Sequence, residues 1–199
     1  MSWIRTIDRA AAQGRLRALY KRIEGPGGRI DNIIKVHALR PHTLDGHMTL
    51  YRSVLHHAGN RLPRFWLETL GVYVSHLNRC NYCVEHHFAG LKRLLGDDAR
   101  AHQIREALES GELASAFDER EQAMLRYARE LTRQPPSVVQ AQVEALREAG
   151  LEDGEILEVN QVVAYFAYAN RTALGLGVRT AGDALGLSPD DPAADWRHC

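Results

Sequence analysis

Hydrophobic residues recur at helical spacing along most of the chain, and alternation typical of strands is hard to find. Residues with β-branched side chains are thinly spread, which also disfavours a sheet. We therefore expect an all-α fold, a single-domain helical bundle over residues 1–199. The pattern predicts helices over residues 6–23, 41–57, 63–78, 80–95, 98–110, 118–132, 137–149 and 152–179.

Glycine, proline and polar clusters separate these helices. Breaks are predicted at the Gly-Pro-Gly-Gly run 25–28, at Gly59-Asn60, at Gly96 and at Pro135-Pro136. A short segment over 32–39 leads to Pro41, whose fixed φ suits the first turn of a helix. Residues 188–199 are polar and contain proline, so we expect a flexible tail there.

The predicted helix over 63–78 carries apolar residues on more than one face, which indicates a buried helix. Glu68 lies within it, and a carboxylate in such surroundings is costly unless it is partnered or protonated. On the same face, Gly71 and Ser75 are small enough to admit a neighbouring helix. An ion pair with Arg64, one turn earlier, is an equally acceptable role for Glu68.

Composition and charge narrow the class of protein. A chain of 199 residues is long enough for one well-buried core. The 25 basic and 25 acidic residues balance, so nothing indicates a nucleic-acid or membrane-surface partner. No apolar run has the length of a signal peptide or of a transmembrane helix. We therefore expect a cytoplasmic protein.

The cysteines are few, and their spacing is informative. The chain has three, of which Cys199 is the last residue and is interpreted as incidental. In a reducing compartment the close pair Cys80 and Cys83 indicates metal binding or redox chemistry rather than a structural disulfide.

The predicted helix that starts at Cys80 brings three reactive groups to one face. On a helical wheel Cys80, Cys83 and His87 lie within about 60° of one another. Unpaired N–H groups at a helix start favour a thiolate, and a neighbouring imidazole can accept the proton. His86 points further away. Of the ten histidines, only His87 acquires a role from this geometry.

The residues alone leave several kinds of site open. A C-x-x-C pair can reduce an oxidant through a sulfenic acid and then close a disulfide. Cys80, Cys83, His87 and Glu68 could instead bind zinc. The cysteines could also be ordinary buried side chains. Attachment of c-type haem is excluded, because Val84 rather than histidine follows the second cysteine.

The spacing of Glu68, Cys80-Asn81-Tyr82-Cys83 and His87 resembles the active-site signature of the alkylhydroperoxidase D-like family, within the carboxymuconolactone decarboxylase-like superfamily. The segments HMTLYRSVLHHAGNRLPRFWLETLGVYVSHLNRCNYCVEHH and NRTALGLGV resemble its branch of uncharacterised peroxidase-related proteins. The likeness covers about residues 10–187. It implies an all-helical fold with the C-x-x-C at the start of a core helix, and a homo-oligomer that reduces hydroperoxides.

The resemblance also implies a role for each residue of the signature. Cys83 attacks the peroxide, Cys80 resolves the product, and Glu68 with His87 forms a proton relay. Tyr82 stands where the best-studied members have a second histidine, which implies a shorter relay or one through the tyrosine hydroxyl.

The resemblance implies no metal or organic cofactor. It implies a dithiol reductant protein, lipoyl-bearing or thioredoxin-like, as partner. Two alternatives to the peroxidase remain open: a dithiol-disulfide oxidoreductase that does not use peroxide, and a redox-sensing or zinc-binding helical protein without turnover.

Overall fold

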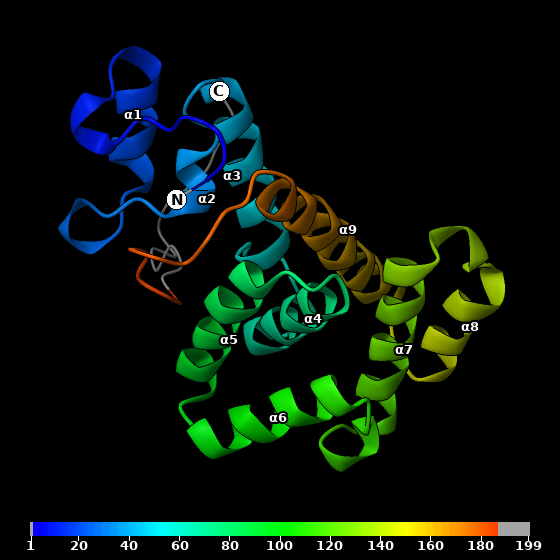
Figure 1. Ribbon diagram of the computed structural model, residues 1–199. Coiled ribbons are helices and arrows are strands. Elements are labelled where there is room, and N and C mark those ends of the chain that lie inside the picture. Colours follow the sequence, from blue (N-terminus) through cyan, green and yellow to red (C-terminus); the bar gives the residue numbers. More distant parts are fainter. Residues whose placement is uncertain (1, 187–199) are drawn as a thin grey trace.

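The protein is described by a computed structural model over residues 2–186 (Figure 1). That range contains nine α-helices and no strand, which confirms the all-α prediction. The predicted tail 188–199, with Cys199, lies outside the described residues. No helix in the described range is long and apolar enough to cross a membrane. The helices are α1 Gly14–Ile23, α2 Asn32–Lys35, α3 Pro41–Leu55, α4 Arg64–Leu77, α5 Asn81–Leu95, α6 Asp98–Ser110, α7 Glu119–Arg133, α8 Gln140–Glu148 and α9 Asp153–Gly175.

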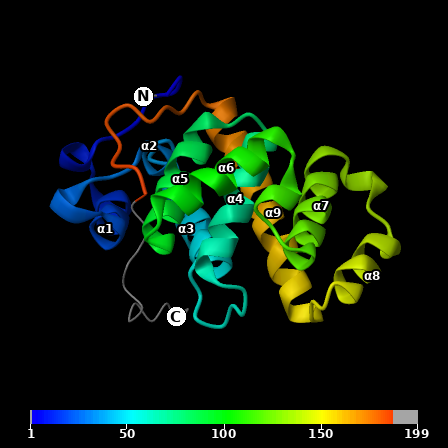
Figure 2. The ribbon, with the colours of Figure 1, turned by 90° about the horizontal axis from the view of Figure 1, so that it is seen from below.

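Helix α4 lies at the centre of the main core. It contacts α3, α5, α6, α7 and α9, and these helices surround it in Figures 1 and 2. Every residue from Trp66 to Ser75 is buried, which confirms the prediction of a buried helix. Glu68 is among them, with 4% of its surface exposed. A carboxylate is therefore held inside the most apolar part of the molecule.

Small residues on α4 let α9 approach closely, as their spacing predicted. A Cβ atom added to Gly71 would lie 2.3 Å from the ring of Phe166 on α9. One turn later the Ser75 hydroxyl accepts a hydrogen bond of 3.0 Å from the Asn170 amide. The α4–α9 contact thus begins apolar and ends in a polar pair beside the start of α5.

The N-terminal helices form a second apolar cluster. Leu16, Leu19 and Tyr20 of α1 pack with Leu44 and Met48 of α3. Helix α1 is shorter than the predicted 6–23. Gln13 is extended and Gly14 has a φ of +52°, a left-handed value that interrupts a right-handed helix. The residues before it form only a 3₁₀ turn, Arg9–Ala11.

The last long helix ends earlier than the predicted residue 179. Helix α9 stops at Gly175, and Gly177 has a φ of +63°. A side chain at Gly177 would collide with the Trp3 ring. Residues 176–186, here called the C-terminal strap, then run back beside α2 and the start of α5 (Figure 1).

The other predicted breaks are close to the observed ends. Helix α6 spans the predicted residues, and Gly96 ends α5 with a φ of +62°. Helix α7 begins with the capping box in which Asp118 and Glu121 bond each other's backbone N–H. Helix α8 begins at Gln140 rather than 137, because Pro135–Ser137 forms a 3₁₀ turn first.

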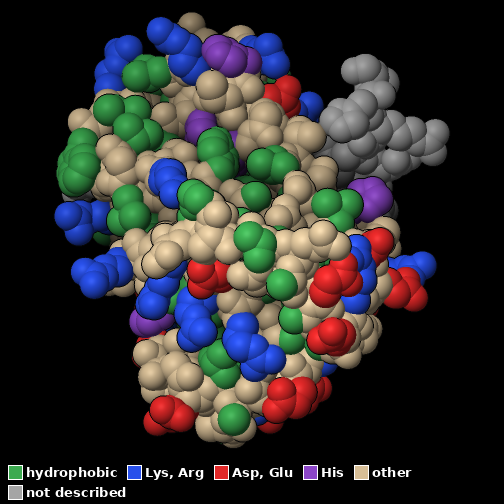
Figure 3. All heavy atoms as spheres, turned by 90° about the vertical axis from the view of Figure 1, so that its right-hand side faces the viewer, with side chains coloured by type: hydrophobic (Ala, Val, Ile, Leu, Met, Phe, Trp, Pro, Cys, Tyr) green, Lys and Arg blue, Asp and Glu red, His purple; other side chains and the backbone are tan. Residues whose placement is uncertain are grey.

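The surface carries charges of both signs. Acidic and basic side chains are interspersed over the face shown in Figure 3, in keeping with a formal net charge of zero. On this face, no broad patch of one sign offers an electrostatic footprint for nucleic acid.

Candidate active site

A tight turn between α4 and α5 places the two cysteines. Arg79 has a φ of +57°, and the Cys80 N–H bonds the Ser75 carbonyl at 2.9 Å. Cys80 is therefore the residue that caps α5, and Cys83 lies within its first turn. Both are free thiols and buried, with 1% and 4% of their surface exposed. The pair thus lies at the start of α5.

The start of α5 stabilises a thiolate at Cys80. The pKa of Cys80 is lowered from 9.0 to about 7, chiefly by a hydrogen bond from the Cys83 thiol. The backbone N–H groups of Cys83 and Tyr82 and the charge of His87 contribute to this lowering, and burial opposes it. The pKa of Cys83 is raised, because its proton is held by the Cys80 sulfur and because it is buried. The first proton therefore leaves Cys80.

Glu68 and His87 form the second half of the site. The His87 Nδ1 and the Glu68 Oε2 lie 2.6 Å apart, and both side chains are largely buried. The structure thus gives Glu68 the ring of His87 as its partner, whereas Arg64 donates to His56. The His87 ring also packs edge-on against Phe166 at 4.6 Å. The four predicted residues thus lie on the packed helices α4 and α5 and at the turn between them.

The zinc alternative requires the same four side chains to converge on one point. No group of three or more His, Cys, Asp or Glu side chains within residues 2–186 could hold a metal ion. Glu68 is hydrogen-bonded to His87 instead, and the Cys80 and Cys83 thiols are hydrogen-bonded to each other.

Asn170 supports the cysteine pair from α9. Its amide donates to Ser75 and to Cys83, and its carbonyl accepts from Asn78 at 2.9 Å. This fully buried side chain fixes the α4–α5 turn and touches the sulfur. The sequence analysis did not propose Asn170 as a site residue, although it begins the segment NRTALGLGV.

Tyr82, between the two cysteines, points away from the relay. Its hydroxyl accepts from the Ile33 N–H at 3.1 Å and donates to Asp183 at 2.8 Å. Burial and the nearby charge of Asp183 raise the pKa of the Tyr82 hydroxyl above its ordinary value. The hydroxyl is therefore committed to two partners, and a relay through it is not what the structure shows.

Asp183 links the C-terminal strap to α2 and α5. Its side chain is fully buried and accepts from Tyr82, from His86 at 3.2 Å and from the Asn32 N–H at 3.1 Å. His86, a weaker candidate in the sequence, is thus part of this attachment. No motif signalled Asp183, because its partners are far away in the chain.

The strap and α2 cover the cysteine pair. Val36, which directly follows α2, and Val178 of the strap pack with Cys80, Tyr82 and Cys83 in one buried cluster. The sulfurs consequently lie beneath a layer of side chains held in place by Asp183.

Solved structures of other proteins have a similar fold. A peroxidase-related protein from Ralstonia eutropha JMP134, described as an alkylhydroperoxidase core, is 25% identical with a TM-score of 0.77, over 89% of this chain and 91% of that one. A peroxidase-related protein from Silicibacter sp. TM1040 is 25% identical with a TM-score of 0.72, over 82% of this chain and 83% of that one. The chain belongs to the alkylhydroperoxidase D-like superfamily. The resemblance seen in the sequence is thereby confirmed.

The alkylhydroperoxidase D-like fold also carries other chemistry. A debrominase crystallised with 2,3,4-tribromopyrrole shares the fold with a TM-score of 0.72 at 16% identity, over 87% of this chain and 89% of that one. At that identity the likeness concerns the fold alone. No protein-family model and no curated protein matches the sequence.

Further polar rings extend the candidate site towards α3. The Tyr51 ring lies 4.7 Å from His56, 5.8 Å from Tyr165 and 6.5 Å from His87, measured between ring centres. Tyr165 in turn lies 6.0 Å from the buried His47. None of these residues was predicted to belong to the site, although His47, Tyr51 and His56 lie in the segment HMTLYRSVLHH that carries part of the resemblance.

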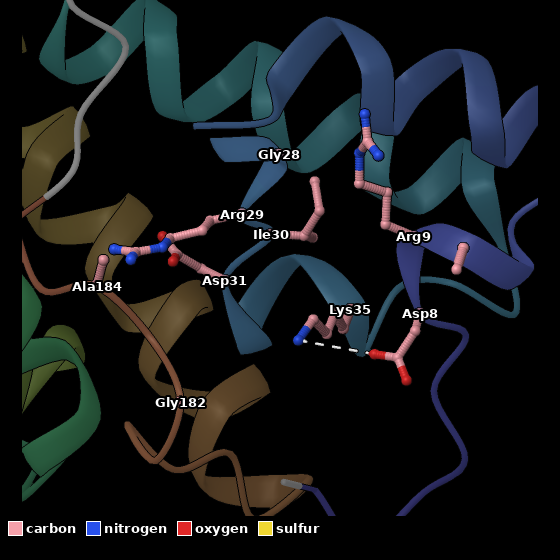
Figure 4. A pocket seen from close by; sticks show the side chains of 10 residues that line it. Asp8, Arg9, Gly28, Arg29, Ile30, Asp31, Lys35, Gly182 and Ala184 are labelled. Carbon is pink, nitrogen blue, oxygen red and sulfur yellow. Dashed lines mark ion pairs between the residues drawn. The ribbon is translucent and has the colours of Figure 1, made fainter. Parts of the chain in front are cut away.

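A pocket of about 250 Å³ opens on the outer side of the strap (Figure 4). Asp8 and Lys35, 3.8 Å apart, lie on one side of it, and Gly182 and Ala184 of the strap lie on another. None of the four predicted site residues lines it. It is therefore a separate feature of this alkylhydroperoxidase D-like chain.

Proposed function

We propose that the protein is a thiol-dependent hydroperoxide reductase that uses Cys80 and Cys83 as a redox pair and Glu68 with His87 as a proton relay. The observation that supports it most strongly is the hydrogen-bonded sulfur pair at the start of α5, beside the 2.6 Å contact of His87 and Glu68. The names of the neighbours, which are peroxidase-related or alkylhydroperoxidase proteins, support the same reaction.

The chemistry needs only the residues of this site. One thiolate attacks the terminal oxygen of the hydroperoxide, a sulfur–oxygen bond forms and the oxygen–oxygen bond breaks. The thiol proton, taken up by His87, passes to the alkoxide and releases an alcohol. The second sulfur then displaces water from the sulfenic acid and closes the disulfide. Two electrons leave the dithiol and reduce the peroxide.

The order of the sulfurs has two candidates. The family resemblance gives Cys83 the attack and Cys80 the resolving step, and we propose that order. The low pKa of Cys80 favours the reverse order, because a thiolate is the nucleophile. The proton in the Cys83–Cys80 hydrogen bond can be held by either sulfur, and the other sulfur is then the thiolate. The two orders therefore differ only in which sulfur holds this proton.

The remaining assignments belong to the same proposal. The reductant is a dithiol protein, lipoyl-bearing or thioredoxin-like, and the enzyme is a homo-oligomer that works in the cytoplasm without a metal or organic cofactor. The alternative of a dithiol-disulfide oxidoreductase acting on protein substrates is less well supported. Both sulfurs are buried, so a small oxidant reaches them more readily than a protein disulfide does.

The test is consumption of a hydroperoxide with a dithiol as reductant. We expect multiple turnovers in the wild type and their loss in Cys83→Ser and Cys80→Ser, with Cys199→Ser as the matched control that keeps the rate. Trapping the sulfenic acid with a dimedone-type probe in each single variant identifies the attacking sulfur. If the probe labels Cys83 in the Cys80→Ser variant, the result supports the proposed order, in which Cys83 attacks the peroxide.

The relay is tested separately. Glu68→Gln and His87→Gln are each expected to slow peroxide reduction by about 10²–10⁴-fold, the usual contribution of a positioned acid or base. No peroxide consumption above the buffer background in the wild type, with the cysteines still cycling between dithiol and disulfide, would reject the peroxidase in favour of the oxidoreductase.

A further inference from the structure

His56 lies at the end of α3, and its hydrogen bond fixes where its proton is. A guanidinium N–H of Arg64 and the His56 Nδ1 lie 3.1 Å apart. Because arginine has no acceptor, the Nδ1 atom must accept this bond. The proton of the neutral ring is then on Nε2, which makes Nε2–H a hydrogen-bond donor.

The Nε2 atom of His56 is buried and has no hydrogen-bond partner among residues 2–186. A buried donor left unsatisfied is destabilising, because it has lost its hydrogen bond to water without a replacement. The ring cannot relieve this by changing its charge, because burial and the nearby arginines lower the pKa of His56 to about 4. His56 is therefore a neutral donor at neutral pH that requires an acceptor.

The position of His56 relates this donor to the proposed relay. The Tyr51 ring contacts both His56, at 4.7 Å, and His87, at 6.5 Å. The charges of Glu68 and His87 both act on His56. His56 is therefore separated by one aromatic ring from His87 of the Glu68–His87 pair.

The charges around His56 select the kind of acceptor. Arg64 and Arg52 both act on the His56 and Tyr51 side chains with positive charge. The one acidic neighbour that acts on His56, Glu68, is already paired with His87. Tyr51 stays protonated because burial and Glu68 raise its pKa, so its hydroxyl is a second donor. Donors within a positive potential suit an anionic oxygen group.

We propose that His56, Tyr51 and Arg64 form a binding site for a carboxylate of the substrate, beside the Glu68–His87 pair. The substrates are then hydroperoxides of carboxylic acids, with the peroxide at the dithiol and the carboxylate at His56. This substrate class rests on the proposed hydroperoxide reductase, whereas the carboxylate site itself does not.

The first experiment compares two peroxides that differ only in charge. Cumene hydroperoxide and its para-carboxy derivative share the ring and the peroxide, and the methyl ester of the derivative controls for size. We expect the wild type to favour the carboxylate over both neutral compounds by about tenfold or more in kcat/KM, as for a charged group bound by fixed donors.

The variants remove the donor and the charge in turn. His56→Phe and Arg64→Gln are each expected to lower the carboxylate preference by at least about fivefold, and His56→Gln, which keeps an N–H, to restore part of it. The matched controls are His42→Phe and Arg17→Gln, whose side chains are exposed on α3 and α1. These controls should keep the wild-type preference.

Calorimetry with para-isopropylbenzoate tests the site without any turnover. Binding by the wild type, weakened in Arg64→Gln and His56→Phe but unchanged in Arg17→Gln, supports the site even if no peroxide is consumed. An enzyme that reduces all three peroxides equally and does not bind the benzoate would overturn the carboxylate site and leave the peroxidase standing.

Discussion

The sulfur of Cys80 has an environment that few cysteines share. It receives a hydrogen bond from a second thiol and lies against two backbone N–H groups, while nine-tenths or more of its surface is shielded from solvent. Burial alone would raise the pKa of a thiol, so these donors must outweigh it. These donors therefore favour a thiolate at Cys80.

The pH dependence of alkylation follows from that balance. Because the pKa of Cys80 is lowered to about 7, the thiolate is present at a lower pH than in an ordinary cysteine. We expect the rate of alkylation by iodoacetamide to rise between pH 6 and 8 with a midpoint near 7. Rates read by mass spectrometry across this range provide the test.

The matched variant is Cys83→Ala, which removes the thiol donor. Its alkylation midpoint should move upwards, towards the ordinary value of 9.0. An unchanged midpoint in Cys83→Ala would assign the low pKa to the start of the helix alone.

At the scale of helices, the site depends on how closely α9 approaches α4. The Phe166 ring occupies the space in which a side chain at Gly71 would lie, and it also packs against His87. The contact between two helices thus also positions the imidazole of the proposed relay.

Substitution of this glycine should therefore be costly. Gly71→Ala places a Cβ 2.3 Å from the Phe166 ring, so we expect a loss of about 1–3 kcal/mol in the free energy of unfolding. Gly46→Ala, on α3 with no atom within 4 Å of the added Cβ, is the control and should stabilise by about 0.5–1 kcal/mol. Urea titration measures both, and equal effects of the two variants would contradict the packing argument.

The attachment of the strap is a second property of elements. Asp183→Asn removes the charge that holds Tyr82, His86 and the start of α2. We expect the free energy of opening the strap to fall by about 1–3 kcal/mol. Cys80 and Cys83 should then react about tenfold faster with a bulky maleimide. Asp98→Asn, exposed on α6, should leave that rate unchanged. Equal labelling rates in the two variants would show that Asp183 does not hold the cover.

The sequence predicted the local part of this architecture well. Residues of α6 and the capping box of α7 depend on neighbours within one turn, and their predicted ends agree with the structure. The predicted start of the first helix, at residue 6, was wrong, because a helical pattern does not reveal that Gly14 adopts a left-handed conformation.

The candidate site divides in the same way. Glu68, Cys80, Cys83 and His87 lie on two adjacent helices, and their spacing was sufficient to find them. Asn170 and Asp183 act through contacts between distant segments, such as the 151 positions between Asn32 and Asp183. Such pairs leave no periodic signal in one sequence.

At the scale of the whole molecule, the formal net charge is zero, and charges of both signs are interspersed on the face shown in Figure 3. The proposed homo-oligomer would therefore depend on apolar contacts. We expect sedimentation velocity to give two, three or six times the mass of one chain, with little change between low and high salt. A species with the mass of one chain at micromolar concentration would contradict the homo-oligomer.

The cover over the cysteine pair also determines the rate law for any large reductant. A protein that attacks the disulfide needs a bare sulfur, so its attack must follow an opening step. At low concentration of the reductant the observed rate rises in proportion, and at high concentration it levels off at the opening rate. That plateau belongs to the enzyme rather than to the reductant, and it sets an upper limit on turnover that no better partner can raise.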